Sequence, residues 1–237
     1  MLFGGLQKLT LIDYPGKVAC TVFTVGCNFR CPFCYNSELV LPEKIKKQLK
    51  ISEKEFFKFL KSRKKIIEGV CVTGGEPTIH KNLPDFIKKI KKLGYLVKLD
   101  TNGSNLEMLK NLIDKKLVDY VAMDIKQSQK SKVKSQKYDK ATGVKVNLDD
   151  IKKSINIVKN SGIDHEFRTT VVPTIHTKED IIQIARDISP AKKYFLQNFR
   201  PEKTLNPKFK KIKPYPQEFL LEIQKTITSF FEICQIR

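Results

Sequence analysis

The chain has 237 residues, of which 41% are hydrophobic and 30% charged, with a formal net charge of +20 at pH 7. This length suits one sizeable core and is short for two ordinary domains plus a linker, so we expect a single domain over residues 1–237. No apolar run approaches the roughly 18 residues that would suggest a membrane span. The opening residues show neither a basic leader nor a long apolar stretch, which predicts a cytoplasmic protein without membrane association.

Lysine is spread along nearly every expected helix, which is typical of solvated helix faces. A basic surface that attracts an acidic protein or nucleic acid is the alternative. The basic residues are dispersed and are not interleaved with exposed aromatic residues, so nucleic acid binding is not expected. Residues 126–145 stand apart, with seven lysines and one aspartate, and are expected to form a mobile loop or an electrostatic contact surface.

Strand-like and helix-like patterns alternate along the chain. The expected strands are Val18 to Thr24, Gly69 to Thr73, Tyr95 to Asp100, Tyr120 to Asp124, Glu166 to Val172 and Tyr194 to Asn198. The expected helices are Ser52 to Lys64, Pro84 to Leu93, Leu106 to Lys116, Asp149 to Ser161, Lys178 to Ser189 and Gln217 to Glu232. Six β-then-α units call for parallel strands in an α/β fold, either an open sheet or a barrel.

Three cysteines follow the first strand with C-x3-C-x2-C spacing: Cys27, Cys31 and Cys34. Three thiolates on one short loop can hold three irons of a cubane cluster, which leaves the fourth iron open to a small molecule. A structural zinc site would close its coordination with a fourth nearby ligand, but none follows until Cys71 and His80. A disulfide is disfavoured because three is an odd number.

The remaining cysteines lie in apolar runs and are expected to be packing residues, since cysteine is often buried as a small hydrophobe. Two belong to strand-like runs and one lies near the end of a helical run: Cys20, Cys71 and Cys234. The three histidines show no ligand spacing among themselves and are unassigned: His80, His165 and His176.

Polar residues gather where the other strands end, which is where α/β folds place their chemistry. Gly74-Gly75-Glu76-Pro77 follows the second strand. It is either a tight turn that needs glycine dihedrals or a site where main-chain carbonyls and a carboxylate hold a cationic ammonium. Asp100 and Asn102 follow the third strand, in a turn whose polar side chains face the same rim.

Alternation places Asp124 and Lys126 on one face at the end of the fourth strand, where a buried salt bridge is the alternative to a ligand site. Arg168 lies inside an otherwise apolar strand and needs a carboxylate partner. That partner is either a ligand's carboxylate or a structural Asp or Glu.

With the aromatic Phe33 before its last cysteine, the loop resembles the C-x3-C-x-aromatic-C signature of the radical S-adenosylmethionine (SAM) enzymes. Members of that family bind SAM through the open iron and pass one electron into its sulfonium, which gives methionine and a 5′-deoxyadenosyl radical. The resemblance implies a [4Fe-4S] cluster on Cys27, Cys31 and Cys34, in a partial (β/α)6 TIM-like barrel with parallel strands.

The later motifs resemble those of the glycyl-radical-enzyme activases within that family: Gly-Gly-Glu at 74–76, Asp-Thr-Asn-Gly at 100–103 and Asp-Ile-Lys at 124–126. The resemblance implies that these residues contact SAM, with a monovalent cation beside the two aspartates. The implied cofactor-binding residues are Phe33, Gly74, Gly75, Glu76, Asp100, Asn102, Asp124, Lys126 and Arg168.

Three further stretches resemble the activating proteins of anaerobic ribonucleoside-triphosphate reductase: Leu9 to Lys17, Cys34-Tyr35-Asn36 and Tyr138 to Gly143. The resemblance implies that reductase as the partner, although many activases have His where Tyr35 stands. The ferredoxin-like insert of other activases is absent, so one cluster and an external flavodoxin or ferredoxin as electron donor are expected. The alternatives are a radical SAM enzyme acting on a small molecule, as a deazapurine synthase does, or a non-catalytic metal-binding module.

Overall fold

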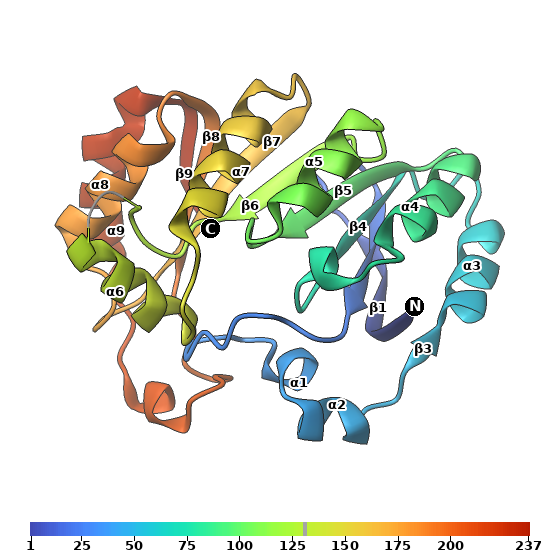
Figure 1. Ribbon diagram of the computed structural model, residues 1–237, viewed down its shortest axis with the longest axis horizontal. Helices are drawn as coiled ribbons and strands as arrows, with labels where there is room; N and C mark the ends of the chain where they lie inside the picture. Colours follow the sequence, from blue (N-terminus) through green and yellow to red (C-terminus); the bar gives the residue numbers. More distant parts are fainter. Residues whose placement is uncertain (130–131) are drawn as a thin grey trace. The chain divides into compact units, whose positions relative to one another are not determined.

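The computed structural model describes residues 1–129 and 132–237 (Figure 1). The chain divides into two compact units, each described here by itself. Unit 1 comprises residues 1–28, 38–101 and 105–121, and unit 2 comprises residues 29–37, 102–104 and 122–237. The expectation of a single domain stays a prediction. Within the described residues, no helix has the length and apolar character needed to cross a bilayer.

Unit 1 is built on five strands in the order β3-β1-β2-β4-β5. β4 is parallel to β2 and to β5, whereas β1 is antiparallel to β2 and β3. Rings from β1, α3 and α4 pack together, with centroids 5.0 to 5.6 Å apart. The strands are β1 (Leu2–Thr10), β2 (Ala19–Thr24), β3 (Ile51–Ser52), β4 (Gly69–Gly74) and β5 (Leu96–Thr101). The helices are α1 (Ser37–Val40), α2 (Pro42–Lys47), α3 (Glu53–Ser62), η1 (Pro77–Ile79), α4 (Leu83–Lys92) and α5 (Leu106–Asp114). The first residue of α1, Ser37, is assigned to unit 2 and the rest of that helix to unit 1.

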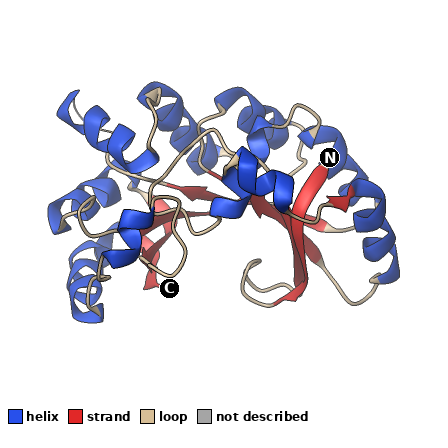
Figure 2. Cartoon of the chain, turned by 90° about the horizontal axis from the view of Figure 1, so that it is seen from below, coloured by secondary structure: helices blue, strands red, loops and turns tan. Residues whose placement is uncertain are grey.

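Unit 2 contains the parallel strands β7, β8 and β9, and β6 (Tyr120–Asp124) enters it at residue 122. Helices alternate with these strands along the chain, as Figure 2 shows in blue and red. The strands are β7 (Asp164–Val171), β8 (Ala191–Asn198) and β9 (Phe231–Ile236). The helices are α6 (Lys132–Thr142), α7 (Leu148–Asn160), α8 (Lys178–Ile188), η2 (Pro207–Lys211), α9 (Gln217–Ile227) and η3 (Thr228–Phe230).

The predicted α/β class with mostly parallel strands is confirmed, and each of the six expected strands is present within three residues of its expected ends. The capping box at the start of α3 is also present, because Ser52 accepts from the Glu55 amide and Glu55 accepts from the Ser52 amide. Closure into a partial barrel stays a prediction.

The expected last helix, Gln217 to Glu232, is wrong at its end. α9 stops at Ile227, and residues 231–236 form β9, which pairs with β8 and contains Cys234. The segment contains two isoleucines and one phenylalanine, which favour a strand when a neighbouring strand edge is available. β1 and β3 were missed because two glycines and a lysine interrupt the alternation of β1 and because β3 has only two residues.

The lysine-rich segment 126–145 was expected to form a mobile loop or an electrostatic contact surface. The loop is wrong for its larger part, which is the helix α6, and the contact surface stays a prediction. Lys130 and Ser131 of that segment lie outside the described residues. Tyr138 and Ala141 bury one face of α6, and Lys137 Nζ lies 2.8 Å from the Asp180 carboxylate at the start of α8. The helix therefore rests on packing, which lysine content alone does not reveal.

Candidate functional site

The cysteine loop begins where β2 ends. Gly26 and Cys27 belong to unit 1, and the Gly26 amide donates to the Leu39 carbonyl at 2.6 Å. Cys31 and Cys34 belong to unit 2 and share one turn, in which the Cys34 amide donates to the Cys31 carbonyl at 3.0 Å. All six cysteines lie within the described residues, and none of them forms a disulfide bond there.

No group of three or more Cys, His, Asp or Glu side chains within residues 1–129 and 132–237 is placed to hold a single metal ion. Each thiolate of a cubane binds a different iron, so a cluster does not require the sulfurs to converge on one ion. Three soft thiolates within eight residues are the donor set that iron–sulfur clusters use.

Within unit 2 the cysteine loop is held by two neighbouring segments. The Arg30 amide donates to the Thr142 carbonyl at 2.7 Å, and the Asn206 amide donates to the Pro32 carbonyl at 2.9 Å. Gly143 has φ +71°, and a Cβ there would lie 2.3 Å from the Arg30 carbonyl oxygen. Only glycine therefore fits at 143, which explains why a glycine follows Thr142 at the end of α6.

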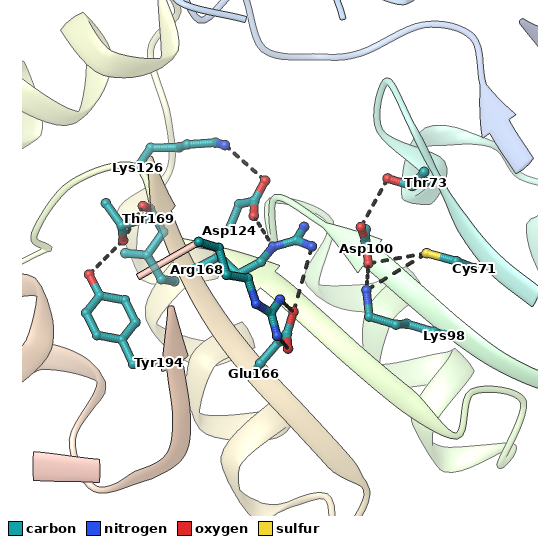
Figure 3. A network of polar contacts seen from close by, with 12 residues as sticks. Cys71, Thr73, Lys98, Asp100, Asp124, Lys126, Glu166, Arg168, Thr169 and Tyr194 are labelled. Atoms are coloured by element: carbon teal, nitrogen blue, oxygen red, sulfur yellow. Dashed lines mark hydrogen bonds and ion pairs between the residues drawn. The ribbon is translucent and has the colours of Figure 1, made fainter. Parts of the chain in front are cut away.

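Lys126 lies beside the cysteine loop. Its Nζ is 3.1 Å from the Asp124 carboxylate and 6.0 Å from the ring centroid of the buried Phe33 (Figure 3 shows the ion pair). Burial acts to lower the pKa of Lys126, but the Asp124 carboxylate and the Cys31 and Cys34 thiols outweigh it and hold the pKa above its usual range. Lys126 is therefore a stable cation next to two of the expected cluster ligands.

Arg168 joins this network from β7. Its Nε donates to the Asp124 carboxylate at 2.8 Å, and its Nη1 lies 3.9 Å from the fully buried Glu166 (Figure 3). Glu166 also pairs with Arg237 at 3.1 and 3.2 Å. Burial acts to raise the pKa of Asp124, but Arg168 and Lys126 hold it well below its usual range. The structural salt bridges foreseen for Asp124, Lys126 and Arg168 are thus present, and their contacts with SAM stay predictions.

His176 supports the same network, although the sequence left it unassigned. Its Nδ1 accepts from the Val172 amide at 3.0 Å, and its Nε2 donates to the Lys126 carbonyl at 2.8 Å. Burial lowers the pKa of His176 to about 4, so the ring is neutral at neutral pH and holds the main chain of Lys126. No spacing signal in the sequence reveals such a role.

Glu76 is anchored inside unit 1. It is almost fully buried, and its Oε1 accepts from the Thr78 amide at 3.1 Å, the Thr78 hydroxyl at 2.5 Å and the Thr101 hydroxyl at 2.7 Å. The sequence did not mark Thr78 or Thr101. Because three donors meet one carboxylate oxygen, the orientation of Glu76 is fixed by the fold.

The two glycines before Glu76 are required by close main-chain packing. Gly74 has φ +121°, and a Cβ there would lie 2.3 Å from the Thr24 nitrogen. A Cβ on Gly75 would lie 1.9 Å from the Gly26 carbonyl oxygen, to which the Glu76 amide donates at 2.8 Å. The tight-turn alternative is therefore present, and it places the Gly-Gly-Glu main chain against the start of the cysteine loop.

Asp100 forms a polar cluster in unit 1. It pairs with the buried Lys98, accepts from the Thr73 hydroxyl at 3.2 Å, and lies 3.7 Å from the Cys71 sulfur (Figure 3). Lys98 was missed because it stands inside an apolar strand, where its position itself signals a buried charge in need of a carboxylate. In unit 2, Asn102 Oδ1 accepts hydrogen bonds from the Ser104 amide at 2.9 Å and from the Ser104 hydroxyl at 2.6 Å.

The cysteines outside the loop behave as packing residues. Burial raises the pKa of the Cys20 thiol to about 12 and that of Cys234 to about 11, and Cys71 is fully buried. His80 Nε2 bonds the Val25 carbonyl at 2.9 Å and His165 Nδ1 bonds the Ile163 carbonyl at 3.0 Å, whereas the buried His165 Nε2 has no hydrogen-bond partner among the described residues.

Comparisons with known proteins agree with this architecture. A Methanocaldococcus jannaschii protein named as a candidate glycyl-radical enzyme activating enzyme is 32% identical over 242 residues, covering 100% of this chain and 95% of that protein. The anaerobic ribonucleoside-triphosphate reductase-activating protein of Escherichia coli K12 is 28% identical over 83 residues, which are 35% of this chain and 53% of that protein.

Among solved structures, SuiB of Streptococcus suis bound to the precursor peptide SuiA superposes with a TM-score of 0.66 at 16% identity. The match covers 91% of this chain, and this chain spans about half of SuiB, 47% of its length. At this identity the likeness shows the fold alone. The Radical SAM superfamily profile matches residues 21–188, which is more than half of the chain, and the chain therefore belongs to the radical SAM superfamily.

Proposed function

We propose that this chain is an activating enzyme that reductively cleaves SAM and generates a glycyl radical on a partner enzyme. The observation that carries the proposal is the turn of Cys31 and Cys34 beside the cation of Lys126, which is itself paired with Asp124. A full-length relative named as an activating enzyme of glycyl-radical enzymes supports the same activity.

The residues present fit the cofactors that the superfamily uses. Cys27, Cys31 and Cys34 would hold a [4Fe-4S] cluster, because three thiol side chains lie within one short loop and none of them is in a disulfide bond of the described structure. Such a cluster, when bound, supplies one electron to the sulfonium of SAM and leaves one iron open to its amino and carboxylate groups. The ammonium of Lys126 offsets the negative charge that the thiolates bring to a partly buried loop.

The other predicted residues would bind and orient SAM. The main-chain carbonyls of Gly74 and Gly75 with Glu76 offer acceptors to the N–H groups of the SAM amino group, and Asp100 and Asn102 offer acceptors to its ribose and methionyl group. Lys126 and Arg168 offer donors to its carboxylate. Preorganisation favours this role, since each side chain is already held by protein partners and loses little freedom when SAM binds. A monovalent cation beside the aspartates is part of the same proposal.

Anaerobic ribonucleoside-triphosphate reductase is the partner that we propose, supported by the similarity to the E. coli activating protein over about a third of the chain. An acidic flavodoxin or ferredoxin is the proposed electron donor, because the net charge of +20 favours association with an acidic carrier. Six cysteines without a disulfide bond in the described structure suit a reducing cytoplasm as the compartment.

The test is electron paramagnetic resonance (EPR) of a co-encoded anaerobic reductase mixed with reconstituted protein, SAM and a reductant. A glycyl-radical doublet on the reductase is expected. Turnover of a purine-like small molecule without any doublet would replace this function with that of a small-molecule radical SAM enzyme. A cluster signal that ignores SAM would instead point to a non-catalytic binding module.

A further inference from the structure

Tyr138, on the buried face of α6, carries a hydroxyl group that the fold does not use. The side chain is fully buried, and its oxygen has no hydrogen-bond partner within the described part of the chain. The main chain of Lys126 lies near the hydroxyl, but without the geometry of a hydrogen bond. A buried hydroxyl without a partner costs about 1–3 kcal/mol, so the position calls for an explanation.

The C-terminal end of α6, one helical turn after Tyr138, is bonded to the cysteine loop. Thr142 lies one helical turn later and donates its hydroxyl to the Tyr138 carbonyl at 3.0 Å. The Thr142 carbonyl in turn accepts from the Arg30 amide, and Gly143 packs against the Arg30 carbonyl. The end of α6 is therefore fixed on the residue that precedes Cys31.

The charges around the hydroxyl agree with this placement. Burial raises the pKa of Tyr138, the Cys31 thiol and the Asp124 carboxylate act in the same direction, and Lys126 opposes them. Tyr138 is therefore a neutral O–H donor within electrostatic reach of Cys31. The Tyr138 hydroxyl bonds none of these neighbours in the structure. The Lys126 ammonium cannot accept a hydrogen bond, and the Asp124 carboxylate is already engaged by Arg168 and Lys126, whereas the Cys31 sulfur would become an anionic acceptor on binding a cluster.

We propose that Tyr138 is a positioning residue whose hydroxyl donates a hydrogen bond to the anionic sulfur that Cys31 contributes to the bound cluster. This inference rests on the proposed function, since it requires a cluster on Cys31. Hydrogen bonds to cluster sulfurs stabilise the reduced form and so raise the reduction potential. Tyr138 would thus set how readily the cluster accepts its electron and would help to retain the cluster in the loop.

The test replaces Tyr138→Phe, which removes the hydroxyl and keeps the ring, in protein reconstituted anaerobically without SAM. The reduction potential is measured by a redox titration followed by EPR, and exchangeable protons near the reduced cluster are measured by electron–nuclear double resonance in H2O and D2O. We expect a more negative potential and the loss of one exchangeable-proton coupling.

Tyr194→Phe is the matched control. Tyr194 is also fully buried in unit 2, but its hydroxyl donates to the Thr169 hydroxyl at 2.9 Å. The potential and the proton couplings of this variant should equal those of the wild type. In cluster-free protein the two variants should differ in the opposite way. Tyr194→Phe should lower the unfolding temperature because it removes a formed hydrogen bond, whereas Tyr138→Phe should leave the unfolding temperature unchanged.

Unchanged potential and couplings in Tyr138→Phe would overturn the inference, and so would a shift that appears only after SAM is added, because SAM would then be the acceptor. Loss of the cluster from Tyr138→Phe, with an intact apo fold and full occupancy in Tyr194→Phe, would support it. A wild-type protein that takes up no cluster would instead overturn the proposed function on which the inference rests.

Discussion

His176 makes the stability of the protein depend on pH, because burial lowers its pKa from 6.5 to about 4. The neutral ring accepts from the Val172 amide through Nδ1 and donates to the Lys126 carbonyl through Nε2. Protonation of Nδ1 would remove the acceptor of the Val172 amide and place a cation near Lys126 and Lys137, which both lower the pKa of His176. The facing carboxylate is Asp180, whose own pKa is lowered by Lys137 despite burial, so Asp180 titrates below this window.

The pKa values of His176 in the unfolded and folded protein give the sign and size of its effect on the unfolding free energy. The pKa of His176 falls from 6.5 to about 4 on folding, so the folded state binds this proton less readily than the unfolded state. Its contribution is present above pH 6.5 and is lost as the pH falls toward about 4. At roughly 1.4 kcal/mol per pH unit, this gap corresponds to about 3 kcal/mol of unfolding free energy.

The assay is urea unfolding of the cluster-free protein, followed by circular dichroism from about pH 7 to about pH 4. His176→Gln, which cannot titrate, serves as the reference at each pH. The unfolding free energy of the wild type should fall by about 3 kcal/mol relative to the variant across this range. A difference between the two proteins that stays constant with pH would refute the role assigned to His176.

Two further substitutions test the site. Gly75→Ala should destabilise the apo protein by at least about 1–3 kcal/mol, because its Cβ would lie 1.9 Å from the Gly26 carbonyl oxygen. Gly5→Ala, whose Cβ would meet nothing closer than 3.5 Å, is the control, and equal unfolding temperatures would contradict the packing argument. Asp124→Asn should weaken SAM binding to reconstituted protein, measured calorimetrically, while the fold survives, because charge is lost and shape is kept. Asp85→Asn at an exposed ion pair is its control, and a large loss of stability with unchanged SAM affinity would make Asp124 purely structural.

The sequence predicted the helices and strands whose hydrophobic residues recur with a regular period. It did not predict segments whose secondary structure depends on pairing with a neighbouring strand. Residues 231–236 read as the end of a helix, yet the free edge of β8 makes them a strand. The cysteine spacing and the Gly-Gly-Glu turn could be recognised because short loops constrain residue types directly. The sequence could not identify Glu166, His176 and Tyr138 as neighbours of Arg168 and Lys126. These residues reach the site only through packing between elements that are distant in the chain.

The most direct test of the central claim is the EPR spectrum of the reduced, reconstituted protein with and without SAM, compared across the wild type, Cys34→Ala and Cys71→Ala. Cys71 is a buried cysteine in β4 beside Asp100 and is expected to serve only packing. SAM should change the cluster signal and be cleaved to 5′-deoxyadenosine in the wild type and Cys71→Ala, but not in Cys34→Ala. A SAM-responsive cluster that persists in Cys34→Ala and disappears in Cys71→Ala would contradict the assignment of the open iron to the cysteine loop.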